Sequence, residues 1–188
     1  MRLFTGLSLS RSALSQVTLV LDQLRDSAPL RWSPPENLHI TTAFIGEWEP
    51  ARLEALETAL AQVPAPSAVP VSITGFGYFP NPDRPRSLYL AVEPEPALVA
   101  LAHRIENALA ALGHVREARP YRPHVTLARM ARENITQLRL RTASMTSRFP
   151  LETFEATAFY LYESRPAPGG SAYTTLASFP IAGSGGTK

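Results

Sequence analysis

Hydrophobic and polar residues alternate over some parts of the chain and recur at helical spacing over others. A period of two predicts a strand, whereas spacings of three and four residues predict a helix. Strands are therefore expected at residues 2–9, 37–46, 71–79, 87–93, 123–129, 153–163 and 172–180. Helices are expected from Ser12 to Arg25, from Leu53 to Val63, over 98–112 and around 133–141. Strands and helices are mixed along the whole chain.

Prolines and glycines mark the breaks between these elements. Pro34 and Pro35 interrupt the pattern at 32–36, because paired prolines disfavour both a helix and a central strand. The proline-rich segment 80–86 is expected to be the loop of a hairpin. No linker or change of composition divides the chain, so residues 1–181 are expected to form one domain. Residues 182–188 have nothing to pack and are expected to be a flexible tail.

Two segments in different halves of the chain are alike. NLHITTAFIG at 37–46 and RPHVTLARM at 122–130 are both strand-like, and both contain His-x-Thr. Because residues i and i+2 of a strand point to the same face, His39 and Thr41 project together, as do His124 and Thr126. The repeat, about half a chain apart, suggests one domain built of two related lobes.

The paired histidines and threonines point to acid–base chemistry. Imidazole is the side chain best matched to proton transfer near neutral pH, and a hydroxyl can hold an oxyanion. If the two strands lie side by side, one histidine accepts a proton while the other donates one, which suits hydrolysis or transesterification at phosphorus. A single His-x-Thr in a strand is commonplace, whereas two copies in matching strands favour a catalytic role.

Metal binding is the competing interpretation of these histidines. The chain has no HExxH and no cysteine, and no carboxylate lies within two positions of His124. We therefore expect neither a metal nor a cofactor. His103 and His114 are expected at the surface, with no role in the reaction.

The distribution of charge along the chain is weak evidence about the ligand. The net charge is +2, but residues 1–99 carry seven Arg against ten acids, and residues 100–188 carry ten Arg and one Lys against six acids. Eight arginines fall within 116–148, against two glutamates. A GC-rich genome explains the preference for arginine over lysine, but not this clustering. Arginine suits bidentate contact with phosphate, so the basic segment is compatible with an anionic ligand.

Several protein classes are excluded or disfavoured by what the sequence lacks. Without cysteine there is no disulfide, thiolate nucleophile or iron–sulfur site. GxGxxG, GxxxxGK[ST] and GxSxG are absent. No apolar run approaches the roughly 18 residues needed to span a bilayer, and the N-terminus has only a broken apolar stretch. A cytoplasmic location is expected.

The motifs and their surroundings resemble the 2H phosphoesterase superfamily. HITT at 39–42 and HVTL at 124–127 are similar to its paired signatures. MRLF at the start, NLHITTAFIGE at 37–47, RPRSLYLAVEP at 84–94 and YRPHVTLAR at 121–129 narrow the resemblance. Together they resemble the RNA 2′,3′-cyclic phosphodiesterases, also called LigT-like or 2′-5′ RNA ligase proteins.

The resemblance implies a bilobal α+β fold with a pseudo-two-fold axis, in which antiparallel sheets face a central cleft and helices lie outside. It also implies metal-independent opening of a 2′,3′-cyclic phosphate on RNA to a 2′-phosphate, with reversible 2′-5′ ligation as a further reaction. His39 would be the proton donor and His124 the proton acceptor. Thr41 and Thr126 would bind phosphate oxygens.

Other positions follow the family pattern less directly. Arg129 would add positive charge at the phosphate and Phe44 would stack on a base, although strict alternation places each on the opposite face from its histidine. Tyr121 and Arg122 would line the cleft. Thr42 stands where an aliphatic residue is commoner, which should affect packing behind the strand.

The expected partners are RNA ends or nucleotides carrying a 2′,3′-cyclic phosphate, bound by a monomer with no obligate protein partner. Two alternatives stay open. One is a phosphodiesterase for another cyclic or 2′-5′-linked nucleotide, and the other is a non-catalytic module that binds RNA ends.

Overall fold

The computed structural model describes residues 1–64, 66, 68–130, 135–168 and 170–181. The strands are β1 (Arg2–Ser8), β2 (Arg31–Trp32), β3 (His39–Glu47), β4 (Pro70–Val71), β5 (Ile73–Phe79), β6 (Ser87–Val92), β7 (His124–Arg129), β8 (Phe154–Glu155), β9 (Ala158–Ala167) and β10 (Gly170–Pro180). The α-helices are α1 (Arg11–Arg25), α2 (Leu53–Ala61), α3 (Pro96–Ala111) and α4 (Thr136–Ser144), and the 3-10 helices are η1 (Pro35–Asn37), η2 (Pro50–Arg52) and η3 (Thr146–Arg148). The expected α+β class is confirmed.

In the described residues, one antiparallel sheet of eight strands runs through the middle of the molecule. The strand order is β10-β9-β1-β3-β7-β6-β5, with β2 added beside β7, while β4 and β8 form a separate small pair. β3 and β7 pair through Ile40 and Val125. We call β1, β3, β9 and β10 lobe 1, and β5, β6 and β7 lobe 2. The strands of the two lobes are therefore joined edge to edge, by this short junction, into one sheet.

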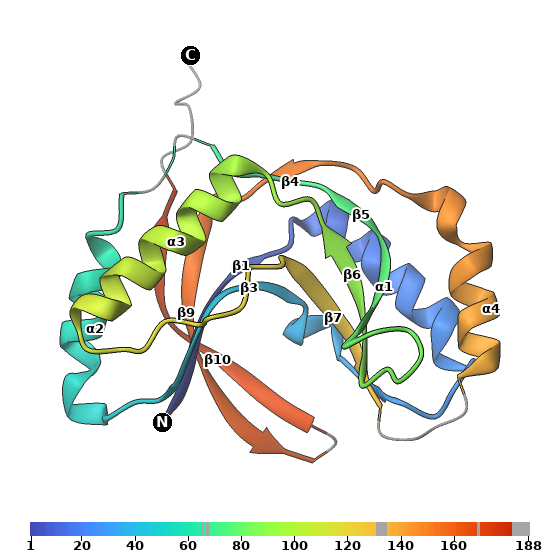
Figure 1. Cartoon of the computed structure of the whole chain (residues 1–188), viewed down its shortest axis with the longest axis horizontal. Coiled ribbons are helices and arrows are strands. Elements are labelled where there is room, and N and C mark those ends of the chain that lie inside the picture. Colours follow the sequence, from blue (N-terminus) through green and yellow to red (C-terminus); the bar gives the residue numbers. More distant parts are fainter. Residues whose placement is uncertain (65, 67, 131–134, 169, 182–188) are drawn as a thin grey trace.

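The helices cross between the lobes. α1 follows β1 of lobe 1 but packs against α4 on the side of lobe 2. α3 follows β6 of lobe 2 but packs against β3 and α2 of lobe 1 (Figure 1). Each lobe is thus covered by a helix whose preceding strand belongs to the other lobe.

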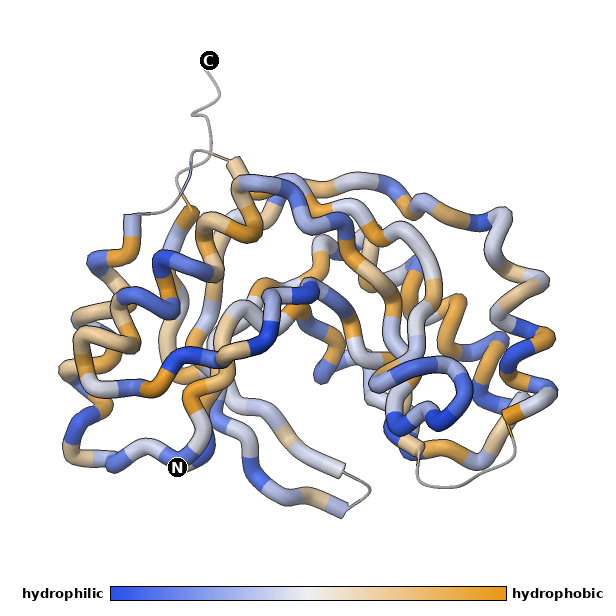
Figure 2. Tube along the Cα trace, in the orientation of Figure 1, coloured by the Kyte–Doolittle hydropathy of each residue, from blue (hydrophilic) through white to orange (hydrophobic). Residues whose placement is uncertain are grey.

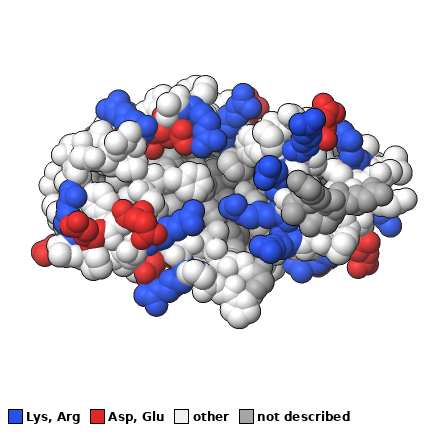
Figure 3. Space-filling model, turned by 60° about the horizontal axis from the view of Figure 1, so that its bottom comes forward, with Lys and Arg blue, Asp and Glu red and all other residues white. Residues whose placement is uncertain are grey.

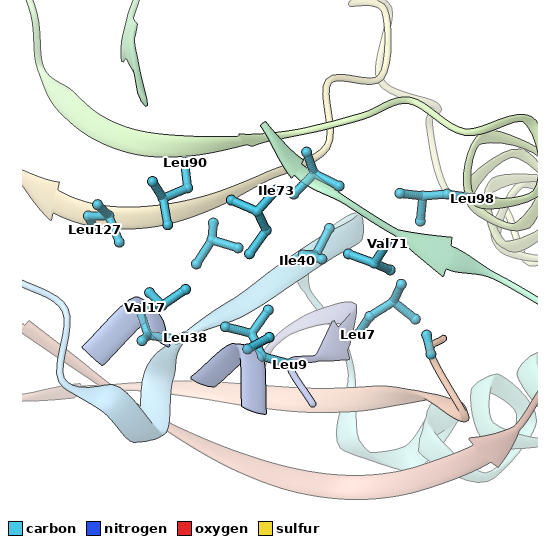
Figure 4. Packing of buried hydrophobic residues seen from close by; sticks show 14 of the residues in the cluster. Leu7, Leu9, Val17, Leu38, Ile40, Val71, Ile73, Leu90, Leu98 and Leu127 are labelled. Atoms are coloured by element: carbon cyan, nitrogen blue, oxygen red, sulfur yellow. The ribbon is translucent and has the colours of Figure 1, made fainter. Parts of the chain in front are cut away.

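One hydrophobic core lies between the sheet and the helices. Alternate residues of β3, β6 and β7 are buried, as period-two patterning predicts. Figure 4 shows Ile40, Val71 and Ile73 near one another in this core, from β3, β4 and β5. Each is 0–1% exposed, and burying such a side chain contributes roughly 1.5–3 kcal/mol. The loop at 80–86 is hydrophilic and lies outside this core (Figure 2).

Most element boundaries lie within two residues of those expected, and the differences have local causes. α1 begins at Arg11 because the Ser10 hydroxyl accepts a hydrogen bond from the Ala13 N–H at 3.1 Å and caps the helix. The strand expected at 71–79 is divided at Ser72, where the chain changes partner from β8 to β6.

Three further expectations concern the break at 32–36, the last helix and the tail. The break begins with β2, which the sequence pattern did not predict. The helix expected around 133–141 is described from Thr136 onward, and residues 133–134 lie outside the described residues. The tail at 182–188 also lies outside them. In the described part of the chain, no helix is long and apolar enough to cross a membrane.

Candidate active site

The two His-x-Thr segments lie side by side where the lobes meet. Because Ile40 pairs with Val125 in antiparallel register, a local two-fold axis passes between these two residues. It relates the His39 segment to the His124 segment. Ile40 and Val125 are fully buried, whereas the histidines and threonines on either side of them are partly exposed. The two histidines and two threonines therefore share the face of the sheet opposite the core.

Both imidazoles are held by the same kind of hydrogen bond. Nδ1 of His39 lies 2.7 Å from the carbonyl oxygen of Asn37, and Nδ1 of His124 lies 2.7 Å from that of Arg122. A carbonyl can only accept, so Nδ1 carries the proton in each neutral ring. This leaves Nε2 of each ring for proton exchange. Nε2 of His39 lies 3.0 Å from the Thr41 hydroxyl oxygen, which donates to it when the imidazole is neutral.

Burial and positive charge lower the pKa of both histidines below the usual 6.5. For His39 the largest cause is desolvation, followed among the lowering effects by the charges of His124 and Arg129. For His124 it is again desolvation, followed by Arg129. The backbone carbonyl at Nδ1 opposes the shift in both cases. The positive charge of Arg129 lowers the pKa of both rings, and this favours neutral imidazoles in the absence of a bound anion.

A β-bulge in each motif strand places the residue five positions after the histidine on the histidine's own face. In β7, Tyr89 pairs with Thr126 and Leu88 with Ala128, so Leu127 is the extra residue. Leu127 and Ala128 are both buried, and Arg129 emerges on the face of His124. Strict alternation had placed it on the other face. The bulge is the physical reason for the difference.

The same irregularity occurs in β3. Thr5 pairs with Ala43 and Gly6 with Thr41, so Thr42 is the extra residue. Phe44 is consequently on the face of His39, with 61% of its surface exposed. Both bulges fall three residues after a histidine. Phe44 is thus the two-fold mate of Arg129, an aromatic ring in one lobe where the other carries a charge.

Aromatic rings surround both imidazoles, and the sequence analysis did not single them out. His39 lies 4.8 Å from Phe4, 5.2 Å from Tyr173 and 6.0 Å from Tyr162, measured between ring centroids. His124 lies 4.9 Å from Phe79 and 5.3 Å from Tyr89. Phe4 and Tyr89 come from β1 and β6, the strands next to the motif strands, and the other three rings come from strands farther out in the sheet. Their signal in the sequence was an aromatic residue on an alternating strand, which also fits a core position.

The two residues before Pro123 each hydrogen-bond to one of the motifs. The Tyr121 hydroxyl donates to the Thr41 carbonyl at 3.0 Å and links the two motifs. Burial raises its pKa, so it stays protonated. Arg122 contributes its carbonyl to His124, and its side chain is exposed. Tyr121 is therefore a link between the lobes, and its hydroxyl is already engaged.

A cavity of about 210 Å³ opens beside His39. Its lining is partly apolar and partly polar and includes Leu38, Glu36, Tyr162 and Tyr173. The molecule is hollowed near its middle when seen from below the view of Figure 1, with basic side chains gathered on one side of the hollow (Figure 3). In the described residues, no group of three or more His, Asp or Glu side chains is placed to hold a metal ion.

Comparison with known proteins places this geometry in a family. The family model described as the 2′-5′ RNA ligase superfamily matches residues 12–167. An Archaeoglobus fulgidus protein named RNA 2′,3′-cyclic phosphodiesterase is 31% identical over 182 residues, covering 95% of this chain and 99% of its own. A Thermus thermophilus protein of the same name is 30% identical, covering 100% of this chain and 94% of its own.

Solved structures agree with this assignment. A crystal structure of a Thermus thermophilus protein superposes with a TM-score of 0.78 at 25% identity, covering 98% of this chain and 100% of its own. Escherichia coli LigT in its apo form superposes with a TM-score of 0.75 at 25% identity, covering 96% of each chain. The sequence match, the shared fold and the paired motifs agree: the chain belongs to the 2′-5′ RNA ligase superfamily.

Proposed function

We propose that this protein is an RNA 2′,3′-cyclic phosphodiesterase, which opens a terminal cyclic phosphate to a 2′-phosphate. The observation that carries the proposal is the two-fold pair of imidazoles on one face, each with Nδ1 fixed by a carbonyl and Nε2 left for proton exchange. The names of the curated relatives, which match over nearly the whole chain, support the same reaction.

The two-fold arrangement suits displacement at phosphorus. In an in-line reaction the attacking and leaving oxygens lie on opposite sides of the phosphorus, so an acid and a base are needed on opposite sides as well. With the cyclic phosphate near the local axis, Nε2 of His124 takes the proton of the attacking water as the new P–O bond forms. The bond from phosphorus to O3′ breaks, and Nε2 of protonated His39 donates its proton to O3′. The product carries a 2′-phosphate and a free 3′-hydroxyl.

The remaining groups stabilise charge. The hydroxyls of Thr41 and Thr126 donate to the non-bridging phosphate oxygens, whose negative charge grows in the transition state. Arg129 adds a positive charge that already acts on both imidazoles. All of these groups come from one chain, so the proposed mechanism needs no residue of a second copy. The two imidazoles carry out both proton transfers, and no step of the proposed mechanism calls for a metal ion. In the reverse direction His39 and His124 exchange roles, which is how a 2′-5′ ligation would run.

The base of the terminal nucleotide has an aromatic surface available. Phe44 exposes its ring on the active-site face, and stacking on an aromatic ring accepts any base. We assign Phe44 this stacking role. The cavity beside His39 adds space on the side from which the 3′ oxygen leaves.

The test is hydrolysis of a 2′,3′-cyclic mononucleotide and a cyclic-phosphate-ended oligoribonucleotide in excess EDTA, with the product identified as 2′- or 3′-phosphate. His39→Ala and His124→Ala should each lose about 10²–10⁴-fold in rate. His103→Ala is the matched control, because that histidine lies exposed on α3. Activity that survives in both active-site variants, or a 3′-phosphate product, would overturn the mechanism.

Absence of turnover would separate the remaining alternatives. A folded wild-type protein that hydrolyses another cyclic or 2′-5′-linked nucleotide would have the proposed chemistry on a different substrate. A protein that binds cyclic-phosphate ends and releases them unchanged would be a binding module.

A further inference from the structure

Two arginines lie directly opposite one another on neighbouring strands. β2 runs antiparallel to β7, with Arg31 paired with Arg129 and Trp32 with Ala128. Residues directly opposite in an antiparallel pair share a face, with Cβ atoms about 4.5–5.5 Å apart. Both arginine side chains are exposed, and in the described residues neither forms an ion pair with a carboxylate. Like charges in this position repel and destabilise the pair of strands.

The backbone holds this pair in place without using the arginine side chains. The Ser33 N–H donates to the Leu127 carbonyl at 2.8 Å, and the Ser33 hydroxyl donates to the Thr126 carbonyl at 2.8 Å. The indole N–H of Trp32 donates to the Ala28 carbonyl at 3.3 Å. β2 is therefore anchored to the motif strand itself. The backbone pairing therefore fixes where the two arginine side chains leave the sheet, directly opposite one another.

The shared face is the face of the active site. The bulge at Leu127 places Arg129 with His124 and Thr126, and the charge of Arg129 acts on both imidazoles. Arg31, on β2, lies opposite Arg129 on that face, at the end of β7 away from His124. Basic side chains also gather on one side of the hollow of the molecule (Figure 3).

We propose that Arg31 binds a second phosphate of the same RNA strand, the phosphodiester next to the terminal nucleotide, while Arg129 serves the reacting cyclic phosphate. This inference rests on the proposed function and makes its substrate more specific, since the preferred substrate becomes the 3′ end of a polynucleotide. A mononucleotide supplies one phosphate, whereas a polynucleotide supplies a row of them. Two neighbouring arginines, each with a guanidinium group that suits bidentate binding of a phosphate, match two successive phosphates of the strand.

The experiment compares kcat/KM of wild type and Arg31→Gln on a 2′,3′-cyclic mononucleotide and on a cyclic-phosphate-ended oligoribonucleotide. Loss of a charge-assisted contact should lower the oligonucleotide value by about 10- to 100-fold. The mononucleotide value should fall much less. Arg31→Lys, which keeps the charge without the fork, should recover part of the loss. Arg104→Gln is the matched control, because it removes the same charge from α3, behind the sheet.

Two further measurements complete the test. Oligonucleotide binding is measured by fluorescence anisotropy at several salt concentrations. The slope of log K against log[salt] should be smaller in magnitude by about 0.7 in Arg31→Gln than in wild type, which is the contribution of one phosphate on a single strand. Thermal unfolding should show Arg31→Gln to be as stable as wild type or more so, because one of two repelling charges is gone.

Equal losses on both substrates would overturn the inference, as would an oligonucleotide value within twofold of wild type. Absence of turnover by the wild type on both substrates would instead overturn the proposed function. In that case anisotropy still decides about Arg31, since an unchanged affinity and salt slope in Arg31→Gln would refute the second phosphate contact.

Discussion

Replacing Thr42 by valine removes one hydroxyl from a buried pair directly behind the active site. Thr42 is the extra residue of the bulge in β3, and its hydroxyl oxygen lies 2.7 Å from that of Thr5 on β1. Thr42 is 3% exposed and Thr5 is 0% exposed, so water does not readily replace either partner. Valine keeps the shape and the β-branching, and the change therefore isolates the hydrogen bond.

The expected loss of stability follows from the buried hydroxyl that is left without a hydrogen-bond partner. A buried hydroxyl without its partner costs about 1–3 kcal/mol. At this chain length that corresponds to a fall in Tm of about 2–12 °C. Thr5→Val should cost a similar amount for the same reason. The double variant leaves no hydroxyl stranded and should be nearly as stable as wild type, so the coupling free energy is the sum of the two single costs, about 2–6 kcal/mol.

The assay is urea and thermal unfolding of the four proteins, followed by circular dichroism. Ser72 and Thr153 provide a matched exposed pair, with hydroxyl oxygens 2.8 Å apart. Thr153→Val should change the free energy of unfolding by less than about 0.5 kcal/mol, because water takes over the hydrogen bond. Additive effects of Thr5→Val and Thr42→Val, or single variants as stable as wild type, would refute the reasoning.

Three other predictions concern the site. One histidine must be neutral and the other protonated, and both pKa values are lowered, so kcat/KM should follow a bell centred below pH 6.5; Arg129→Gln removes a positive charge, raises both pKa values and should move the bell to higher pH in a pH–rate profile. Gly6→Ala should reduce both activity and Tm, because its Cβ would lie 2.8 Å from the Ile40 carbonyl oxygen, whereas Gly170→Ala meets nothing within 4 Å and should change neither. Tyr121→Phe breaks a part-buried hydrogen bond between the motifs and should cost about 1–3 kcal/mol in urea unfolding, with histidine pKa values measured by NMR as the check on the site.

The sequence predicted the long elements and the shared face of His39, Thr41, His124 and Thr126, because period-two and helical patterns depend only on neighbouring residues. It did not predict where Arg129 and Phe44 would point. A bulge is defined by pairing with another strand, and that pairing depends on residues far away in the chain.

Three other features of the structure were not predicted from the sequence, for related reasons. β2 spans two residues, too few for any pattern, and it exists only because β7 offers a free edge at Ala128 and Arg129. The aromatic rings around the imidazoles carry no local sign of their role. The crossing of α1 and α3 between the lobes was equally hidden, since hydrophobic spacing shows that a helix is covered but not by which sheet.

Because α1 and α3 cross between the lobes, the two lobes depend on each other for stability during unfolding. If lobe 2 unfolds, lobe 1 loses the strand connection that carries α3 and, with it, the cover over β3. If lobe 1 unfolds, lobe 2 loses α1 in the same way. Neither half can persist as a stable intermediate, and a chain cut into its two halves should give no active fragment. Catalytic activity and secondary structure should therefore disappear together, at one denaturant concentration, in a single cooperative transition.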